Sequence, residues 1–109
     1  MEESQYKTKN IQSIINTSDQ KISLDVYSIL IEYDDIAVVS YRLAEAKDIR
    51  TILKKTFPDK NISHYHNTSK LLPSDVILVF EPQFIAPENT KDFDIELSKH
   101  DVPIYFVIS

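Results

Sequence analysis

Two short polar segments follow runs of apolar residues, and they carry the side chains best placed for chemistry. Ser40 and Arg42 come after one apolar run, and Glu81 and Gln83 come after another. A hydroxyl, a guanidinium, a carboxylate and an amide could together bind an anion or move a proton. We therefore take these four residues as the candidate ligand-binding set.

Each of these residues also has a simpler interpretation. Arg42 precedes an expected helix, where a cation and free amide groups could hold an anion, but a solvated loop cation is the more common role. Glu81 could act as a general acid or base, or it could pair with Arg42 and close the pocket. Ser40 has no recognisable histidine partner, so a Ser-His-Asp triad is unsupported. We predict no catalytic residue, and we expect that the chain is not an enzyme.

Metal binding is the other chemistry that the sequence raises. His64 and His66 are two residues apart, so on a strand they would share one face. Zinc needs a third ligand, and none is obvious nearby, so a surface histidine pair is the more common arrangement. The acidic residues Glu32, Asp34 and Asp35 could bind a divalent cation, but we favour the solvated end of the element that precedes the first strand. No metal site and no cofactor are expected.

The composition excludes several classes of protein. The 109 residues include no glycine and no cysteine, which removes the glycine-rich phosphate loops, thiolate nucleophiles and disulfides. Twelve Lys and Arg against seventeen Asp and Glu give a net charge of −5, which opposes nucleic-acid binding by this segment. No apolar run approaches the length of a membrane span, and the N-terminus does not resemble a signal peptide. We expect a cytoplasmic protein without membrane contact.

The pattern of apolar residues predicts an α/β fold with a four-stranded, mainly parallel, Rossmann-like sheet. Strands are expected at 36–41, 61–66, 76–80 and 104–108. Helical spacing predicts flanking helices at 44–57 and 88–100. Right-handed crossovers place the first strand centrally, between the second and the third, with the fourth beyond them, in the order 2-1-3-4. The expected core includes Val38, Ile52, Ile77, Val79 and Phe106.

We expect one domain, 1–109, whose α/β core is 36–109. The segment 1–19 is predicted to be flexible or helical, because it is polar apart from a weak helical pattern at Ile11, Ile14 and Ile15. The stretch 20–33 fits either a helix, capped by Ser18 or Asp19, or a strand. We prefer the helix, since no glycine is available for a tight hairpin.

The segments Ile36–Ser40, Ser74–Gln83 and Val102–Ile108 follow one another in an order that resembles an enzyme IIB domain of the sugar phosphotransferase system. The closest likeness is to the degenerate copy at the C-terminus of Mga-type and antiterminator-type transcription regulators. That family has a phosphorylated cysteine after its first strand, where this chain has Ser40, Tyr41 and Arg42. The family's phosphate loop and final helix also have no counterpart here. The resemblance therefore implies a shared fold and regulatory contacts without phosphotransfer.

Together these observations predict a non-enzymatic regulatory or protein-interaction domain, such as the enzyme IIB-like dimerisation domain of a transcription regulator. The alternative is a small acidic inhibitor or immunity-type protein, phage-encoded or toxin-neutralising, that binds a basic partner surface through its carboxylates. The expected partner is another protein or a second copy of the chain. A dimer is favoured because the apolar strand at 104–108 would lack cover, unless the helix at 22–33 supplies it.

Overall fold

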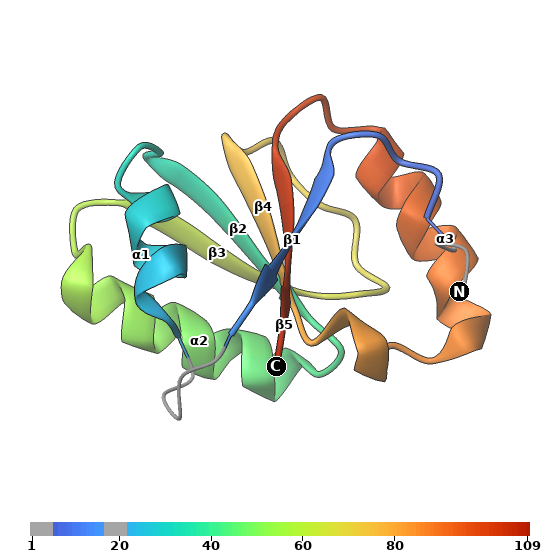
Figure 1. Cartoon of the computed structure of the whole chain (residues 1–109), viewed down its shortest axis with the longest axis horizontal. Coiled ribbons are helices and arrows are strands. Elements are labelled where there is room, and N and C mark those ends of the chain that lie inside the picture. Colours follow the sequence, from blue (N-terminus) through green and yellow to red (C-terminus); the bar gives the residue numbers. More distant parts are fainter. Residues whose placement is uncertain (1–5, 17–21) are drawn as a thin grey trace.

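The computed structural model describes residues 6–16 and 22–109. Within them the chain forms an α/β domain built on one five-stranded parallel sheet (Figure 1). In chain order the elements are β1 (Ile11–Ile15), α1 (Leu24–Leu30), β2 (Asp35–Ser40), α2 (Leu43–Thr56), β3 (Asn61–His66), β4 (Val76–Phe80), the 3-10 helix η1 (Pro82–Phe84), α3 (Pro87–Ser98) and β5 (Ile104–Ile108).

The strands lie in the order β1-β5-β4-β2-β3. β2 pairs with β3 and β4, and β4 pairs with β5, which are the neighbours expected for those four strands. The predicted sheet was nevertheless incomplete, because β1 adds a fifth strand alongside β5. The strand at 104–108 is therefore an interior strand and not the edge.

The helical pattern expected at Ile11, Ile14 and Ile15 was wrong, because these residues belong to β1. Three isoleucines at this spacing fit one helical turn, but β-branched side chains also favour a strand. The deciding factor is distant in sequence: β5 offers a free edge, and β1 pairs with it from Ile11 beside Ile104 to Ile15 beside Ile108. The expected caps Ser18 and Asp19 lie outside the described residues, as do 1–5.

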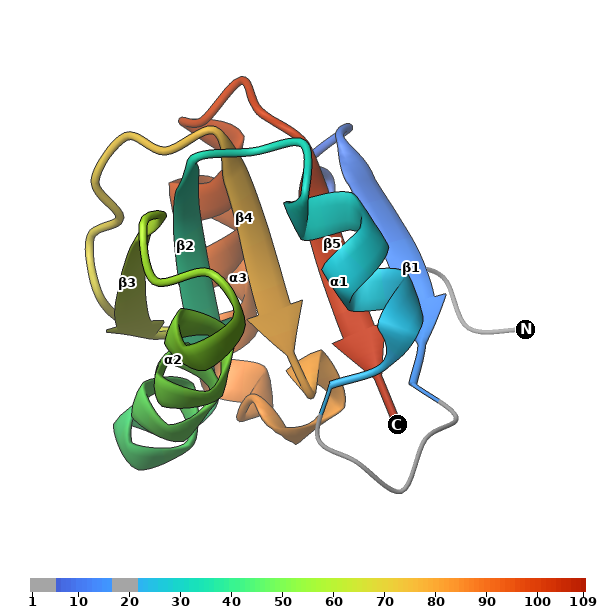
Figure 2. The same ribbon diagram turned by 90° about the vertical axis from the view of Figure 1, so that its left-hand side faces the viewer.

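Helices cover both faces of the sheet (Figure 2). Ile36 and Val38 of β2 pack in one core cluster with α1 and α2, while Ala37 and Val39 pack in a second cluster with α3. Successive side chains of a strand point to opposite faces, so a strand buried on both faces must be apolar throughout. None of the helices in the described part of the chain is long and apolar enough to cross a bilayer.

The helix preferred for 20–33 is present, but it is shorter than expected and spans Leu24–Leu30. Val26 and Leu30 are fully buried, one helical turn apart. They share a core cluster with Val107 of β5, so α1 covers this strand within the same chain. The cover that we expected from a second copy is thus supplied internally, and that reason for a dimer no longer applies.

The long helix α2 lies within one residue of the bounds predicted from the helical spacing of apolar residues. Its buried face consists of Ala46, Ile49 and Leu53, with an acidic residue in the first turn and two lysines in the last, which suits the helix dipole. Of the expected core residues, Val38, Ile77, Val79 and Phe106 are buried. Ile52 is only partly buried at the margin of the core, because it lies one position away from the centre of the buried face.

The connections define where a ligand site would lie. The chain passes from β2 through α2 outward to β3, then returns to β4 and passes through α3 in the other direction to β5. The strand order thus reverses between β2 and β4. In open parallel sheets the crevice at such a point, outside the carboxyl ends of the strands, is the usual ligand site.

Candidate functional site

The residues that follow β2 and β4 lie at the carboxyl ends of these neighbouring strands, where the strand order reverses. Tyr41 follows β2, and Phe84 closes the 3-10 helix that follows β4. Their rings meet edge to face, with centroids 5.3 Å apart and planes at 67°. This geometry is a favourable one for two aromatic rings. The two loops are therefore in contact at the place where an α/β enzyme would hold its substrate.

Arg42 extends this aromatic contact toward solvent. Its guanidinium carbon lies 5.2 Å from the centre of the Tyr41 ring, and its side chain is 63% exposed. The next residue, Leu43, begins α2 and is 51% exposed, and Phe84 is 57% exposed. We name Tyr41, Arg42, Leu43 and Phe84 the carboxyl-end patch. It combines aromatic, aliphatic and cationic side chains on one end of the sheet.

The expected pairing of Arg42 with Glu81 is not observed in the described residues. Arg42 instead lies 3.7 Å from the carboxylate of Glu45, one turn into α2. The carboxylate of Glu81 accepts hydrogen bonds from the Gln83 side chain and from the Ser109 hydroxyl, the latter at 2.8 Å. The structure therefore brings Glu81 and Gln83 together, while Arg42 belongs to a separate contact.

Glu81 also adopts an unusual backbone conformation. Its φ of 56° and ψ of 52° lie in the left-handed region, and among the described residues it alone has a positive φ. This region is costly for residues other than glycine, and such strain often occurs at functional sites. Here it turns the chain from the end of β4 into η1, which carries Phe84 to Tyr41.

Ser40 is completely buried at the end of β2. Its hydroxyl has no hydrogen-bond partner among the described residues. His66 is its register neighbour on β3, but Nδ1 of this imidazole lies 2.9 Å from the Thr68 hydroxyl and accepts from the Thr68 N–H. A buried hydroxyl without a base is not an activated nucleophile.

In the described part of the chain, no third ligand joins the histidine pair. His64 and His66 occupy alternate positions of β3, as expected, yet no group of three potential metal-ligating side chains occurs in the described residues. Burial lowers the pKa of His64, and the charges of Arg50 and Lys47 lower it further. The neutral imidazole is thereby favoured, but these two cations oppose a bound cation.

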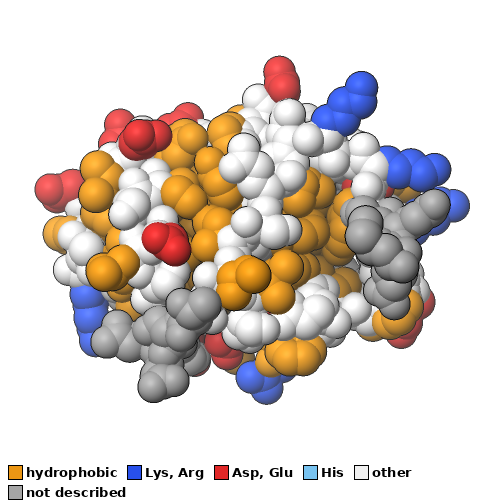
Figure 3. Space-filling view, in the orientation of Figure 1, with side chains coloured by type: hydrophobic (Ala, Val, Ile, Leu, Met, Phe, Trp, Pro, Cys, Tyr) orange, Lys and Arg blue, Asp and Glu red, His pale blue; other side chains and the backbone are white. Residues whose placement is uncertain are grey.

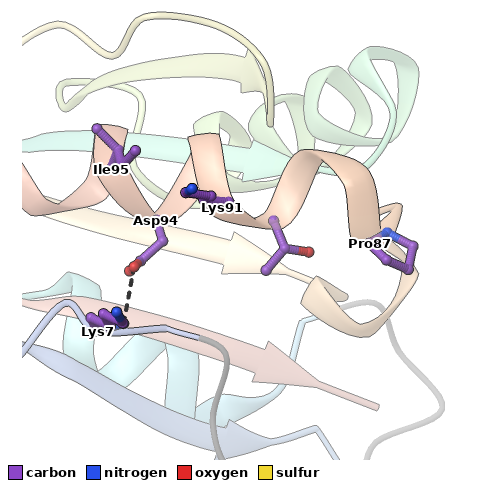
Figure 4. A pocket seen from close by; sticks show the side chains of 6 residues that line it. Lys7, Pro87, Lys91, Asp94 and Ile95 are labelled. Carbon is purple, nitrogen blue, oxygen red and sulfur yellow. Dashed lines mark hydrogen bonds between the residues drawn. The ribbon is translucent and has the colours of Figure 1, made fainter.

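A second hollow, of about 410 Å³, lies between α3 and residues 6–8, which we name the N-terminal strap (Figure 4). Asp94 of α3 accepts hydrogen bonds from the backbone N–H groups of Lys7 and Thr8 and, at 2.7 Å, from the Thr8 hydroxyl. The ring of Tyr6 lies edge-on to Phe106 at 4.8 Å. Burial raises the pKa of Tyr6 to about 12, and the nearby charge of Asp94 adds to this shift. The N-terminal strap is thus fixed against α3 and β5, and its contacts have a structural role.

A third hollow, of about 240 Å³, lies between α3 and the loop after β3. The residues around it are all polar: Asn67, Thr68, Ser69, Lys70, Asn89, Asp92 and Glu96. Glu96 is already engaged, since it accepts the Leu71 N–H at 3.0 Å. This contact, against the opposing effect of burial, holds the pKa of Glu96 below its usual value, and His100 and Lys99 contribute. Its role in this hollow is to anchor the loop.

Phe84 is the residue that the sequence analysis missed. The sequence contains a pattern that could have identified it, because aromatic residues occur shortly after both apolar runs that form the central strands.

Comparisons with known proteins give no further guidance: no family model, curated protein or solved structure matches the chain. The likeness to enzyme IIB domains, and the place in a transcription regulator that it implies, remain predictions from element order.

Proposed function

We propose that this chain is a non-enzymatic protein-interaction domain that recognises its partner through the carboxyl-end patch. The observation that carries the proposal is the contact between Tyr41 and Phe84, which lies where the strand order reverses between β2 and β4. A substrate would have to separate these rings. The same contact leaves the outer parts of both rings available to a partner.

The composition of the patch supports a protein partner. Tyrosine, phenylalanine and arginine are enriched in protein interfaces, and energetically dominant residues are drawn especially from aromatic residues and arginine. The exposed guanidinium of Arg42 lies over the Tyr41 ring, so the cation and the aromatic ring could be contacted together by one partner segment. A partner segment with an acidic side chain beside an apolar one would match Arg42 and Phe84.

The contacts of the candidate residues support the non-enzymatic part of the proposal. Ser40 has no base, and the carboxylate of Glu81 is engaged by Gln83 and Ser109. The candidate residues thus lie at neighbouring strand ends, but their contacts stabilise loops and do not converge on an empty position. A general acid or base needs such a position within hydrogen-bond reach.

The test begins with a photo-crosslinking amino acid at position 84, introduced in the cells that naturally encode the chain, and at the exposed position 95 as a control. The captured protein is then purified, and its affinity is measured calorimetrically for the parent chain and for Phe84→Ala, Arg42→Ala and Ile95→Ala. We expect roughly a tenfold or greater loss for the first two variants, as for interface anchors, and no loss for the third. Equal affinity for all four chains would contradict the proposal.

A second candidate function uses the opposite end of the sheet, where carboxylates gather. The Asp34 side chain is 98% exposed, and Asp75 accepts the Asp35 N–H at 3.2 Å. This arrangement would suit an inhibitor of a basic protein. The same calorimetric experiment distinguishes the two functions, because Asp34→Asn and Asp75→Asn would then weaken binding while Phe84→Ala would not.

A further inference from the structure

We propose that the outer edge of β1 pairs with the same edge of a second copy of the chain, in antiparallel register about Ser13. In the part of the chain that the structure describes, β1 ends the sheet, and no strand lies beyond it. This surface is separate from the carboxyl-end patch, so the inference does not depend on the proposed function.

Backbone hydrogen bonds show which groups of β1 face outward. Asn10 accepts the Ile104 N–H, and the Asn16 N–H donates to Ile108, so even-numbered residues of this segment face β5. Backbone groups alternate in direction along a strand. The N–H and C=O groups of Ile11, Ser13 and Ile15 therefore point away from the sheet, where a further strand can reach them.

The other edge of the sheet, formed by β3, is protected against pairing with a further strand, whereas β1 is not. The Asn61 N–H donates to Asp34 beside β2, so the neighbouring residue Ile62 faces outward from β3. Its carbonyl accepts a hydrogen bond of 2.6 Å from Nε of Arg50 on α2. Charged side chains are a common protection of strand edges against pairing. β1, with the sequence IQSII, has no charged residue.

The sequence of β1 indicates that the partner strand is β1 of a second copy of the chain. Antiparallel pairing about Ser13 places Ser13 opposite its own copy and Ile11 opposite Ile15 of the second copy, on the same face of the sheet. Ile15 is 67% exposed in the single chain, so the pairing buries apolar surface. Each of these pairs also exchanges both backbone hydrogen bonds.

Charge favours the same occupant. Two copies of a chain with a net charge of −5 repel each other, but contact through the uncharged β1 strands places no like charges directly opposite each other. Figure 3 looks onto this edge, with hydrophobic and uncharged side chains over its centre and most charged side chains toward the periphery. Two five-residue strands make a small interface, so the dimer is expected to be weak.

The first test measures mass by sedimentation equilibrium from about 10 μM to about 1 mM, a range suited to weak association. Ser13→Pro removes an outward N–H without removing a bond to β5, whereas Ser13→Ala keeps that N–H. We expect the parent and the alanine variant to dimerise equally, and the proline variant to dimerise at least tenfold more weakly. A parent that stays monomeric throughout, or equal association of both variants, would overturn the inference.

The second test remains decisive if Ser13→Pro fails to fold. Because the chain has no cysteine, Ser13→Cys introduces a single thiol, and directly opposed residues in such a pair lie about 5.5 Å apart, within disulfide reach. Ser28→Cys, exposed on α1, is the control. We expect the position-13 variant to form oxidised dimers several-fold faster. Equal rates for both variants would reject the proposed register.

Discussion

A single carboxylate joins the start of the described chain to its last helix. Asp94 is buried, and burial by itself opposes its ionisation. The hydrogen bonds from the Thr8 hydroxyl and from the N–H groups of Lys7 and Thr8, together with the Lys7 charge, outweigh that effect. They hold the pKa of Asp94 below its ordinary value of 3.8. The ionised carboxylate is therefore part of the folded structure, and protonation weakens it.

This arrangement predicts the pH dependence of Asp94→Asn. A carboxyl group with a lowered pKa stabilises the fold above its unfolded-state pKa, and that contribution disappears as the pH falls through the folded-state value. We expect the variant to lose about 1–3 kcal/mol at pH 7, the usual effect of removing a buried hydrogen-bonded charge. The difference from the parent should shrink below about pH 4.

Urea unfolding at several pH values checks this prediction. Glu96 also has a lowered pKa and titrates in the same range, but it is present in both chains, so its effect cancels in the difference. Asp92→Asn, an exposed change on the same helix, is the control and should change stability by less than about 0.5 kcal/mol. A gap between Asp94→Asn and parent that stays constant down to pH 2 would refute the assigned role.

The backbone of Glu81 gives a second prediction for one residue. Glycine adopts the left-handed region without steric cost, whereas alanine and glutamate do not. Glu81→Gly and Glu81→Ala both lose the carboxylate contacts, so they differ mainly in backbone strain. We expect the glycine variant to be more stable than the alanine variant by about 1 kcal/mol. Thermal unfolding that ranks alanine above glycine would show that the strain is absent.

Among the elements, the three interior strands and β3 at one edge of the sheet could be predicted from sequence, but β1 at the other edge could not. β2 and β4 are buried on both faces, so β4 and the four residues 36–39 of β2 are uninterrupted apolar runs, a pattern typical of interior strands of a parallel sheet. β1 is half-buried, and its pattern fits a short helix as well as a strand. What decides between them is the free edge of β5, which no local pattern contains.

The candidate site shows the same division between local and distant information. Ser40, Arg42, Glu81 and Gln83 lie at strand ends, as apolar runs followed by polar residues indicated. Their partners were not predicted: Arg42 contacts Glu45, three residues along the chain, and Glu81 contacts Ser109, which is distant in sequence. Sequence patterns locate the ends of strands but not the contacts made there.

The central strand β4 gives a prediction at the scale of an element. Ile77 is fully buried in the cluster beneath α3. Ile77→Ala should cost about 2–5 kcal/mol, because it loses transfer free energy and leaves a cavity. Ile31→Ala is the matched control, since Ile31 is 66% exposed, and it should cost less than about 0.5 kcal/mol. Chemical denaturation curves that give equal costs would show that the core is misplaced.

Over the whole molecule, several cations are used to hold the fold together. Lys54 donates to the carbonyls of Pro58 and Lys60, and Lys60 donates to those of Ile31 and Tyr33. Arg50 similarly caps the edge of β3. Lys54 and Lys60 are therefore held against the backbone, with fewer donors left for a ligand.

This distribution of charge predicts that the chain does not bind duplex DNA. Non-specific binding requires cations that neutralise successive phosphates, and here the net charge is −5 while Lys54 and Lys60 are engaged. In fluorescence anisotropy with a random-sequence duplex at physiological salt, we expect a dissociation constant weaker than about 100 μM. A basic DNA-binding protein measured alongside establishes that the assay responds. Micromolar binding that weakens steeply with added salt would mean that the remaining cations contact successive phosphates of the duplex. The argument from net charge would then be wrong.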